Sequence, residues 1–265
     1  MPFIKTILNT LPRPFLLRVS THLRPLLDLY YRGHTFTDPI NGKSYRKFLP
    51  YGYLNIRRNA LSPGTLSLER HRLLWLFLEM KTDLFTHPYR VLHIAPEQAL
   101  MKPLNKMPHL KYITADLHSP LADIKADILS LPFEDESFDV VLCNHVLEHI
   151  PDDRKAMSEL YRVMKPGGWG VFQVPLDNQR ATTYENPDIV EPGDREKHFG
   201  QYDHVRVYGR DYFDRLRQTG FEVQEVDMSE VLTPGQFKRY ALPGGETIPF
   251  CRKKSNGKSD PAQRE

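Results

Sequence analysis

Short apolar runs alternate with amphipathic segments over most of the chain after residue 88, and this alternation constrains the fold more than any other feature. A strand that is covered by helices on both faces is a short continuous apolar run, whereas the helices are apolar on one side only. The pattern therefore predicts an α/β fold with a Rossmann-like, doubly wound, mostly parallel sheet of seven strands and an N-terminal helical and loop-rich extension. The expected strands are residues 90–95, 111–117, 125–129, 138–146, 169–175, 221–228 and 246–251.

Three amphipathic segments predict helices with recognisable ends. The first starts near residue 67, with Glu69 early enough to interact favourably with the helix dipole. In the second, Asp152 is expected to cap the first turn and Gly167 to end the helix. The third precedes the sixth strand and is expected to stop at Gly220.

The chain length of 265 residues suits one large α/β domain with appendages. Residues 1–66 are predicted to form an amphipathic helical arm and a loop-rich insert, because prolines and turn-forming pairs interrupt them. Residues 67–252 would form the α/β domain. Within it, residues 176–208 are long and polar and are expected to form a substrate lid, since loops of that length are usually functional. Residues 253–265 are expected to be a disordered tail.

The composition excludes some classes of protein. The chain has 36 Lys and Arg against 33 Asp and Glu, so its net charge of +3 gives no indication of nucleic-acid binding. The two cysteines lack the spacing of a metal or disulfide pair, which favours a cytoplasmic location. No apolar stretch approaches the roughly 20 residues that span a bilayer. The basic residues of 1–33 would suit a weak contact with a membrane surface, the alternative being an arm that packs on the domain.

Polar residues follow several of the expected strands, where a doubly wound sheet binds its ligands. Asp116 follows the second strand, and a carboxylate there can accept hydrogen bonds from both hydroxyls of a ribose. Asp127 belongs to the third, where it can accept from an adenine amino group while the backbone of Ile128 meets the ring edge. Asn144 and His145 belong to the fourth and are expected on the floor of the same pocket.

Together with these residues, one long string closely resembles the class I S-adenosylmethionine-dependent methyltransferases, in the type 11 branch: LPFEDESFDVVLCNHVLEHIPDDRKAMSELYRVMKPGG. The resemblance covers roughly residues 88–228. It implies S-adenosylmethionine as cofactor and methyl transfer to an unidentified acceptor, expected to be a small polar molecule. The expected cofactor-binding residues come from this resemblance and from the strand ends. They are His93, Ala95, Glu97, Asp116, Leu117, Asp127, Ile128, Asn144 and His145.

The loop after the first strand departs from the family pattern of an acidic residue followed by three alternating glycines. Here His93 stands in the acidic position, and Ala95, Glu97 and Ala99 stand where the glycines are usual. Glu97 could pair with the ammonium group of the cofactor. The alternative is a narrowed pocket and a non-catalytic binding protein of methyltransferase fold. A nicotinamide-dependent oxidoreductase would need a G-x-G-x-x-G motif, which this loop lacks.

The N-terminal insert is similar to that of a subgroup of bacterial methyltransferases in which two Cys-x-x-Cys pairs suit tetrahedral zinc. In this chain the four positions hold Asp38, Asn41, Ser62 and Thr65, so no thiolate is left. The insert is thus expected to be a degenerate zinc-knuckle-like element. Packing of aromatic residues is expected to hold its loops, and these residues are Tyr45, Phe48, Tyr51 and Tyr53.

The string HVLEH at residues 145–149 matches a metalloprotease pattern that needs one long helix. Pro151 interrupts any such helix, and we assign no metal ligand. A divalent ion held by Glu148 and His149 is an alternative, because related E-x-x-E-H strings bind divalent ions in some methyltransferases.

Methyl transfer from a sulfonium is a direct displacement, so the protein must align the reacting atoms and exclude water. An oxygen or nitrogen acceptor also benefits from a base, and histidine is best suited near neutral pH. The candidate bases are His149, His198 and His204. The expected substrate-binding residues of the lid are Tyr202, Asp203, Arg206 and Tyr208, among which Arg206 would suit a carboxylate or phosphate.

Overall fold

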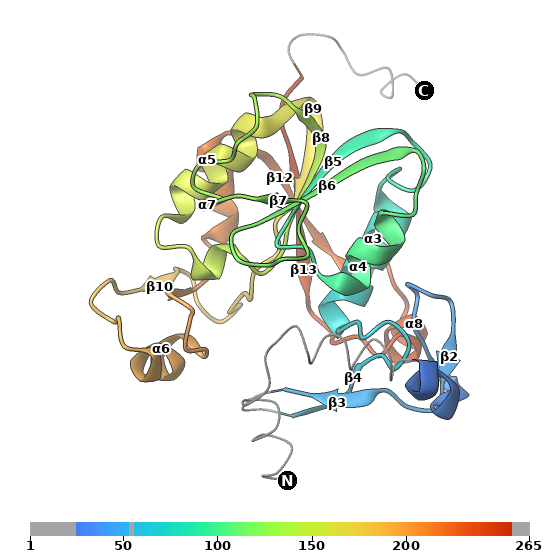
Figure 1. The fold of residues 1–265 in the computed structure, drawn as a ribbon. Coiled ribbons are helices and arrows are strands. Elements are labelled where there is room, and N and C mark those ends of the chain that lie inside the picture. Colours follow the sequence, from blue (N-terminus) through green and yellow to red (C-terminus); the bar gives the residue numbers. More distant parts are fainter. Residues whose placement is uncertain (1–24, 53–55, 256–265) are drawn as a thin grey trace. The chain divides into compact units, whose positions relative to one another are not determined.

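The structure, a computed structural model, describes residues 25–52 and 56–255, which form two compact units (Figure 1). The first unit comprises the described residues up to 81 together with 229–245, and the second comprises 82–228 and the residues from 246. Most of the predicted arm, Tyr53 and most of the predicted tail lie outside the described residues. The predicted domain boundary at residue 67 stays a prediction, although α3 (Glu69–Lys81) groups with the first unit.

A seven-stranded sheet with the order β12-β13-β9-β8-β5-β6-β7 forms the second unit. Its strands are β5 (Tyr89–Ile94), β6 (Leu110–Asp116), β7 (Ile124–Lys125), β8 (Phe138–Cys143), β9 (Met164–Val171), β12 (Glu222–Asp227) and β13 (Thr247–Arg252). Five neighbouring strands run parallel, namely β9, β8, β5, β6 and β7. Strand β13 pairs antiparallel with both β9 and β12. The predicted α/β Rossmann-like, mostly parallel sheet is therefore confirmed.

The helix ends follow local sequence signals in two places and depart from them in one. Asp152 caps α5 (Asp153–Val163) by accepting a hydrogen bond from the backbone N–H of Lys155, and α7 (Tyr212–Thr219) ends at Gly220, whose φ of +114° is left-handed. The prediction that Gly167 ends the first of these helices is wrong. The chain enters the sheet directly after Val163, and Gly167 lies inside β9, where its N–H donates to the carbonyl of Lys253.

The third strand and the predicted lid also differ from expectation. The third expected strand shortens to β7, because Asp127 forms only an isolated bridge with Ser130 around a turn. The predicted lid segment contains short regular elements of its own. These are β10 (Tyr184–Glu185), α6 (Pro192–Phe199) and β11 (Arg206–Val207).

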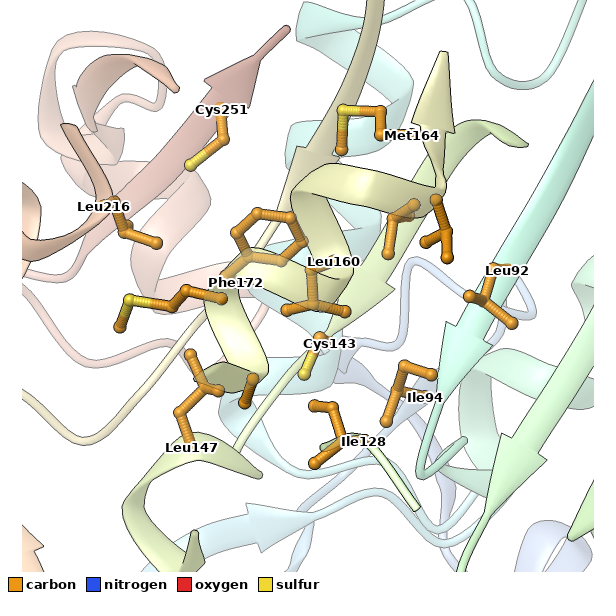
Figure 2. Packing of buried hydrophobic residues seen from close by; sticks show 14 of the residues in the cluster. Leu92, Ile94, Ile128, Cys143, Leu147, Leu160, Met164, Phe172, Leu216 and Cys251 are labelled. Atoms are coloured by element: carbon orange, nitrogen blue, oxygen red, sulfur yellow. The ribbon is translucent and has the colours of Figure 1, made fainter. Parts of the chain in front are cut away.

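Apolar side chains of the sheet pack against α5 and α7, which lie side by side in Figure 1. Figure 2 shows part of this core, in which Leu160 and Leu216 of the helices are near Phe172. Burying one large apolar side chain stabilises a protein by about 1.5–3 kcal/mol. Ile128 and Leu147, which follow strands β7 and β8, belong to the same core. The core thus fixes the loops at the carboxyl ends of the strands as well as the strands themselves.

Arg72 of α3 organises the first unit. Its side chain is fully buried, and its guanidinium donates hydrogen bonds to the carbonyls of Ala60, Ser67, Tyr240 and Ala241. Burial lowers the pKa of Arg72 to about 10, which still leaves it charged at neutral pH. These bonds connect α3 to β4 (Arg57–Leu61) and to the residues that follow α8 (Pro234–Arg239).

Two similar turns form the insert, between β1 (Arg32–Thr37) and β2 (Ser44–Tyr45) and directly after β4. In each turn the first residue, Asp38 or Ser62, donates its N–H to the carbonyl five positions later and accepts a bond from the N–H four positions later. The carboxylate of Asp38 accepts hydrogen bonds from the hydroxyls of Thr65 and Ser67. Polar contacts therefore join the two turns directly.

The aromatic residues of the insert contribute unequally. Tyr45 and Phe48 are buried, with ring centroids 5.8 Å apart, whereas Tyr51 of β3 (Leu49–Tyr51) is 48% exposed. The prediction that Tyr51 packs inside is wrong, because its side chain is exposed to solvent. Among the described residues, no helix is long and apolar enough to cross a membrane.

The cap of α5 can be tested by substitution. We expect Asp152→Ala to lower the free energy of unfolding by about 1 kcal/mol, because the N–H of Lys155 loses its acceptor. Urea unfolding followed by circular dichroism measures the change. Asp152→Asn keeps an acceptor oxygen and should be nearly neutral, and equal losses in both variants would contradict the capping role.

Candidate functional site

A cavity of about 660 Å³ lies in the second unit at the carboxyl ends of the parallel strands. Strand β5 has β6 on one side and β8 on the other, so the chain order reverses there, and this is where doubly wound sheets bind ligands. The volume lies within the usual range for small-molecule sites. The lining residues are Ile94, Ala95, Asp116, Leu117, His118, Ala126, Asp127, Ile128, Leu129, His145, Val146, His149, Ile150, Pro151 and Asp203.

Two carboxylates in the cavity are held by their own turns. Oδ1 of Asp116 accepts hydrogen bonds from the backbone N–H groups of His118 and Ser119, at 2.7 and 2.6 Å. Oδ1 of Asp127 accepts one from the N–H of Leu129 at 2.9 Å. Within the part of the chain that the structure describes, Oδ2 of each carboxylate carries no hydrogen bond. Each is therefore a fixed acceptor with one oxygen left for a ligand.

Left-handed backbone occurs at the ends of two neighbouring strands. Ala95 after β5 has φ +48° and His145 after β8 has φ +54°. Their N–H groups donate to the carbonyls of Ala115 and Gln173, at 2.8 and 2.7 Å. Non-glycine residues in this conformation cost about 1–3 kcal/mol each and cluster at functional sites. The first loop thus makes its sharp turn at an alanine, where the family usually has glycine.

His93 does not reach the cavity. It is fully buried, with Nε2 3.1 Å from Oε2 of Glu97 and Nδ1 2.7 Å from the hydroxyl of Tyr112. Burial, with a smaller contribution from the charge of Glu97, raises the pKa of Tyr112. Glu97 is thereby engaged with His93, and neither residue lines the cavity. Asn144 is buried beside it, with Oδ1 accepting from the N–H of Gln173.

Two of the three candidate histidines lie together. His149, in the short 3₁₀ helix η1 (Leu147–His149), lines the cavity. The ring of His204 is 4.7 Å from that of His149, edge to face. Burial lowers the pKa of His204. His198 is exposed on α6, where it contacts the hydroxyl of Tyr184 at 2.9 Å, and the structure does not bring it to the cavity.

Of the four expected substrate-binding residues, only one lines the cavity. Asp203 lines the cavity, whereas Tyr202 is 55% exposed outside it. Arg206 is buried and donates to the carbonyls of Leu147, Ile150 and Pro151. These donors were expected to face an anionic substrate, but they face backbone carbonyls of η1 and of the turn that follows it.

Tyr208 is likewise buried, and its hydroxyl donates to the carboxylate of Asp153 at 2.8 Å. Arg206 also forms an ion pair with Glu185 at 2.8 Å. Arg215 connects the same two carboxylates, those of Asp153 and Glu185. This network attaches the lid segment to the start of α5 and, through Arg206, to η1.

Sequence reasoning missed several residues that line the cavity. Ile94, Ala126 and Leu129 are apolar neighbours of predicted residues, and adjacency to a strand end was the available signal. Glu148 was weighed only as an alternative metal ligand. It is 2% exposed, and its Oε2 has no hydrogen-bond partner among the described residues.

The fold and the cavity define a Rossmann-like domain with a candidate ligand site at its switch point. Residues 89–172 match the family described as Methyltransferase domain, of type 11, as the sequence resemblance predicts. The predicted methyltransferase class is confirmed for residues 89–172.

Curated relatives match part of the chain. A sterol 24-C-methyltransferase of Candida albicans is 32% identical over 122 residues, which cover 43% of this chain and 30% of that protein. A demethylmenaquinone methyltransferase of Listeria monocytogenes is 43% identical over 58 residues, covering 22% of this chain and 24% of that protein. The match thus spans less than a third of these relatives. Among solved structures, one of a putative methyltransferase from Bacillus halodurans has a TM-score of 0.45 at 19% identity, covering 69% of this chain and 99% of that one.

The role of Arg206 gives a prediction that separates structure from substrate binding. Arg206→Ala should lower the free energy of unfolding by about 3 kcal/mol, because three backbone carbonyls each lose a charged donor and Asp153 loses one of its two nearby arginines. Chemical unfolding measures this loss. Arg210→Ala, an exposed arginine four residues on, should change it by less than about 0.5 kcal/mol. An unchanged free energy of unfolding in Arg206→Ala would contradict the structural role and support a substrate-binding role for this residue.

Proposed function

We propose that this chain is an S-adenosylmethionine-dependent methyltransferase that acts on a small polar acceptor. The observation that carries the proposal is the presence of Asp116 and Asp127 in one cavity at the switch point of a methyltransferase domain. Either carboxylate alone could be a solvated turn. A shared cavity with apolar walls is what a nucleoside with hydroxyl and amino groups requires.

The residues of the cavity fit the cofactor. The free oxygen of Asp116 suits ribose hydroxyls, and Asp127 suits an adenine amino group beside the backbone of Ile128. Apolar contacts from Ile94 and Leu129 suit the faces of the purine ring. When bound, S-adenosylmethionine supplies a methyl group on a positively charged sulfur.

The other proposed roles follow from position. Ala95 and His145, in left-handed backbone at the strand ends, fix the loops against which the methionine part of the cofactor would lie. Asn144 supports the floor from within, as do His93 and Glu97 beneath the first loop. Leu117 covers the rim of the cavity.

The acceptor side of the proposal depends on the segment after η1. His149 is the candidate histidine in the cavity wall and is proposed to handle the proton of an oxygen or nitrogen acceptor. Asp203 is proposed to contact the acceptor, whereas Arg206 and Tyr208 are proposed to position the segment. The acceptor would enter from the side of residues 176–208.

The insert and the location belong to the same proposal. The matching hydrogen bonds of the turns at Asp38 and Ser62 support a knuckle-like insert in which hydroxyl–carboxylate contacts replace metal ligation. A cytoplasmic location is consistent with two free, buried cysteines, Cys143 and Cys251.

The proposal is tested by calorimetry with S-adenosylmethionine and S-adenosylhomocysteine, followed by transfer of a labelled methyl group to acceptors in a cell extract. We expect binding of both and labelling that depends on the protein. Binding without any transfer would favour the alternative of a non-catalytic protein, and no binding at millimolar ligand would overturn the cofactor assignment.

A substitution at Asp116 tests the ribose contact specifically. Asp116→Asn keeps Oδ1 for the N–H groups of His118 and Ser119 but replaces the free acceptor with an amide donor. A hydrogen bond to a charged group contributes about 1.5–3 kcal/mol, so calorimetry should show S-adenosylhomocysteine bound about 10- to 150-fold more weakly. The control Asp214→Ala, on the exposed side of α7, should bind as the wild type does. Equal affinity in Asp116→Asn would remove this carboxylate from the site.

A further inference from the structure

A compact group of potential ligands adjoins the cavity. Glu148, His149 and His204 each offer an atom, and the three atoms lie within 4.8 Å of one another. Glu148 and His204 are 2% and 5% exposed, while His149 is half-buried and lines the cavity. All three belong to the second unit, and residues far apart in the sequence form the group because the lid segment returns to η1.

The buried carboxylate of Glu148 indicates that this group of residues is not a chance contact. Oε2 of its carboxylate is buried without a hydrogen-bond partner among the described residues, while Oε1 is 3.4 Å from Nδ1 of His145. A buried polar atom without a partner is costly, and in native proteins such an atom often marks an absent ion or water. The unpartnered oxygen belongs to the same residue that contributes to the ligand group.

We propose that Glu148, His149 and His204 bind a divalent transition-metal ion such as Zn²⁺, Mn²⁺ or Co²⁺. Two imidazoles and one carboxylate suit these ions, whereas Mg²⁺ and Ca²⁺ prefer sites made of oxygen atoms. The distances leave only small side-chain adjustments for all three residues to reach one ion.

Neighbouring groups hold the ligands as outer-shell partners do at metal sites. Nδ1 of His149 lies 3.3 Å from the carbonyl and 3.4 Å from Oδ2 of Asp203. Arg206 holds the carbonyls of Leu147 and Ile150 on either side of the first two ligands.

The site is open on one side, because His149 forms part of the cavity wall. Three protein ligands and an open position are typical of a catalytic rather than a structural metal site. The ion would bind an oxygen or nitrogen of the methyl acceptor and lower the pKa of that group. This use rests on the proposed function, whereas ion binding itself does not. With the ion bound, His149 and His204 act as ligands, and His149 would not need to take the proton itself.

Calorimetric titration tests ion binding on the full chain, with any affinity tag removed and metal stripped by a chelator. We expect one Zn²⁺ or Co²⁺ per chain, a visible absorption band for Co²⁺, and much weaker binding of Mg²⁺. Wild-type protein that binds neither Zn²⁺ nor Co²⁺ would overturn the proposal.

Two variants and a control locate the site. Glu148→Gln and His149→Ala should each weaken Zn²⁺ binding by at least the roughly 10- to 100-fold that loss of an outer-shell partner costs. His87→Ala, which removes an exposed histidine outside the cavity, should leave it unchanged. If Glu148→Gln fails to fold by circular dichroism, the half-buried His149 decides the outcome. Unchanged affinity in His149→Ala would overturn the assignment.

The same experiment separates this inference from the proposed function. S-adenosylhomocysteine is titrated into metal-free protein, where Asp116 and Asp127 are unaffected. Cofactor binding without metal binding would contradict only the proposed metal site. Metal binding without cofactor binding would contradict only the proposed methyltransferase function.

Discussion

The reversal of chain order at β5 is the constraint on which the rest of this domain depends. Strands β6 and β8 both pair with β5 in parallel, so their carboxyl ends open on the same crevice. The loops that leave these ends are anchored in the core by Ile128 and Leu147. Hydrophobic burial therefore helps to set the positions of the carboxylates and histidines at the ends of the strands. Packing of the core thus determines the geometry of the site.

The strand ends were predictable from sequence because a buried parallel strand has a simple signature. Asp116, Asp127 and His145 each belong to or follow an apolar run, and all three reach the cavity. Helix ends were predicted from local signals in the same way, and the predicted cap at Asp152 was confirmed. The predicted helix end at Gly167 was wrong, because pairing of the following residues with β8 and β13 overrides a local stop signal.

The lid was harder to predict, because its side chains serve tertiary partners that composition does not reveal. Arg206 looks like an anion ligand in sequence, yet its donors are used by the carbonyls of Leu147, Ile150 and Pro151. The contact between His149 and His204 has the same origin. The hydrogen bond from the N–H of Val205 to the carbonyl of Glu148 brings the two segments together, and no periodicity in either segment encodes it.

We propose that one cavity between the ends of β5, β6 and β8 receives the cofactor. A crystal structure of the chain with S-adenosylhomocysteine would show whether it does. We expect ribose hydroxyls at Oδ2 of Asp116 and the adenine amino group at Asp127. A nucleoside bound elsewhere, or one in this cavity that touches neither carboxylate, would contradict it.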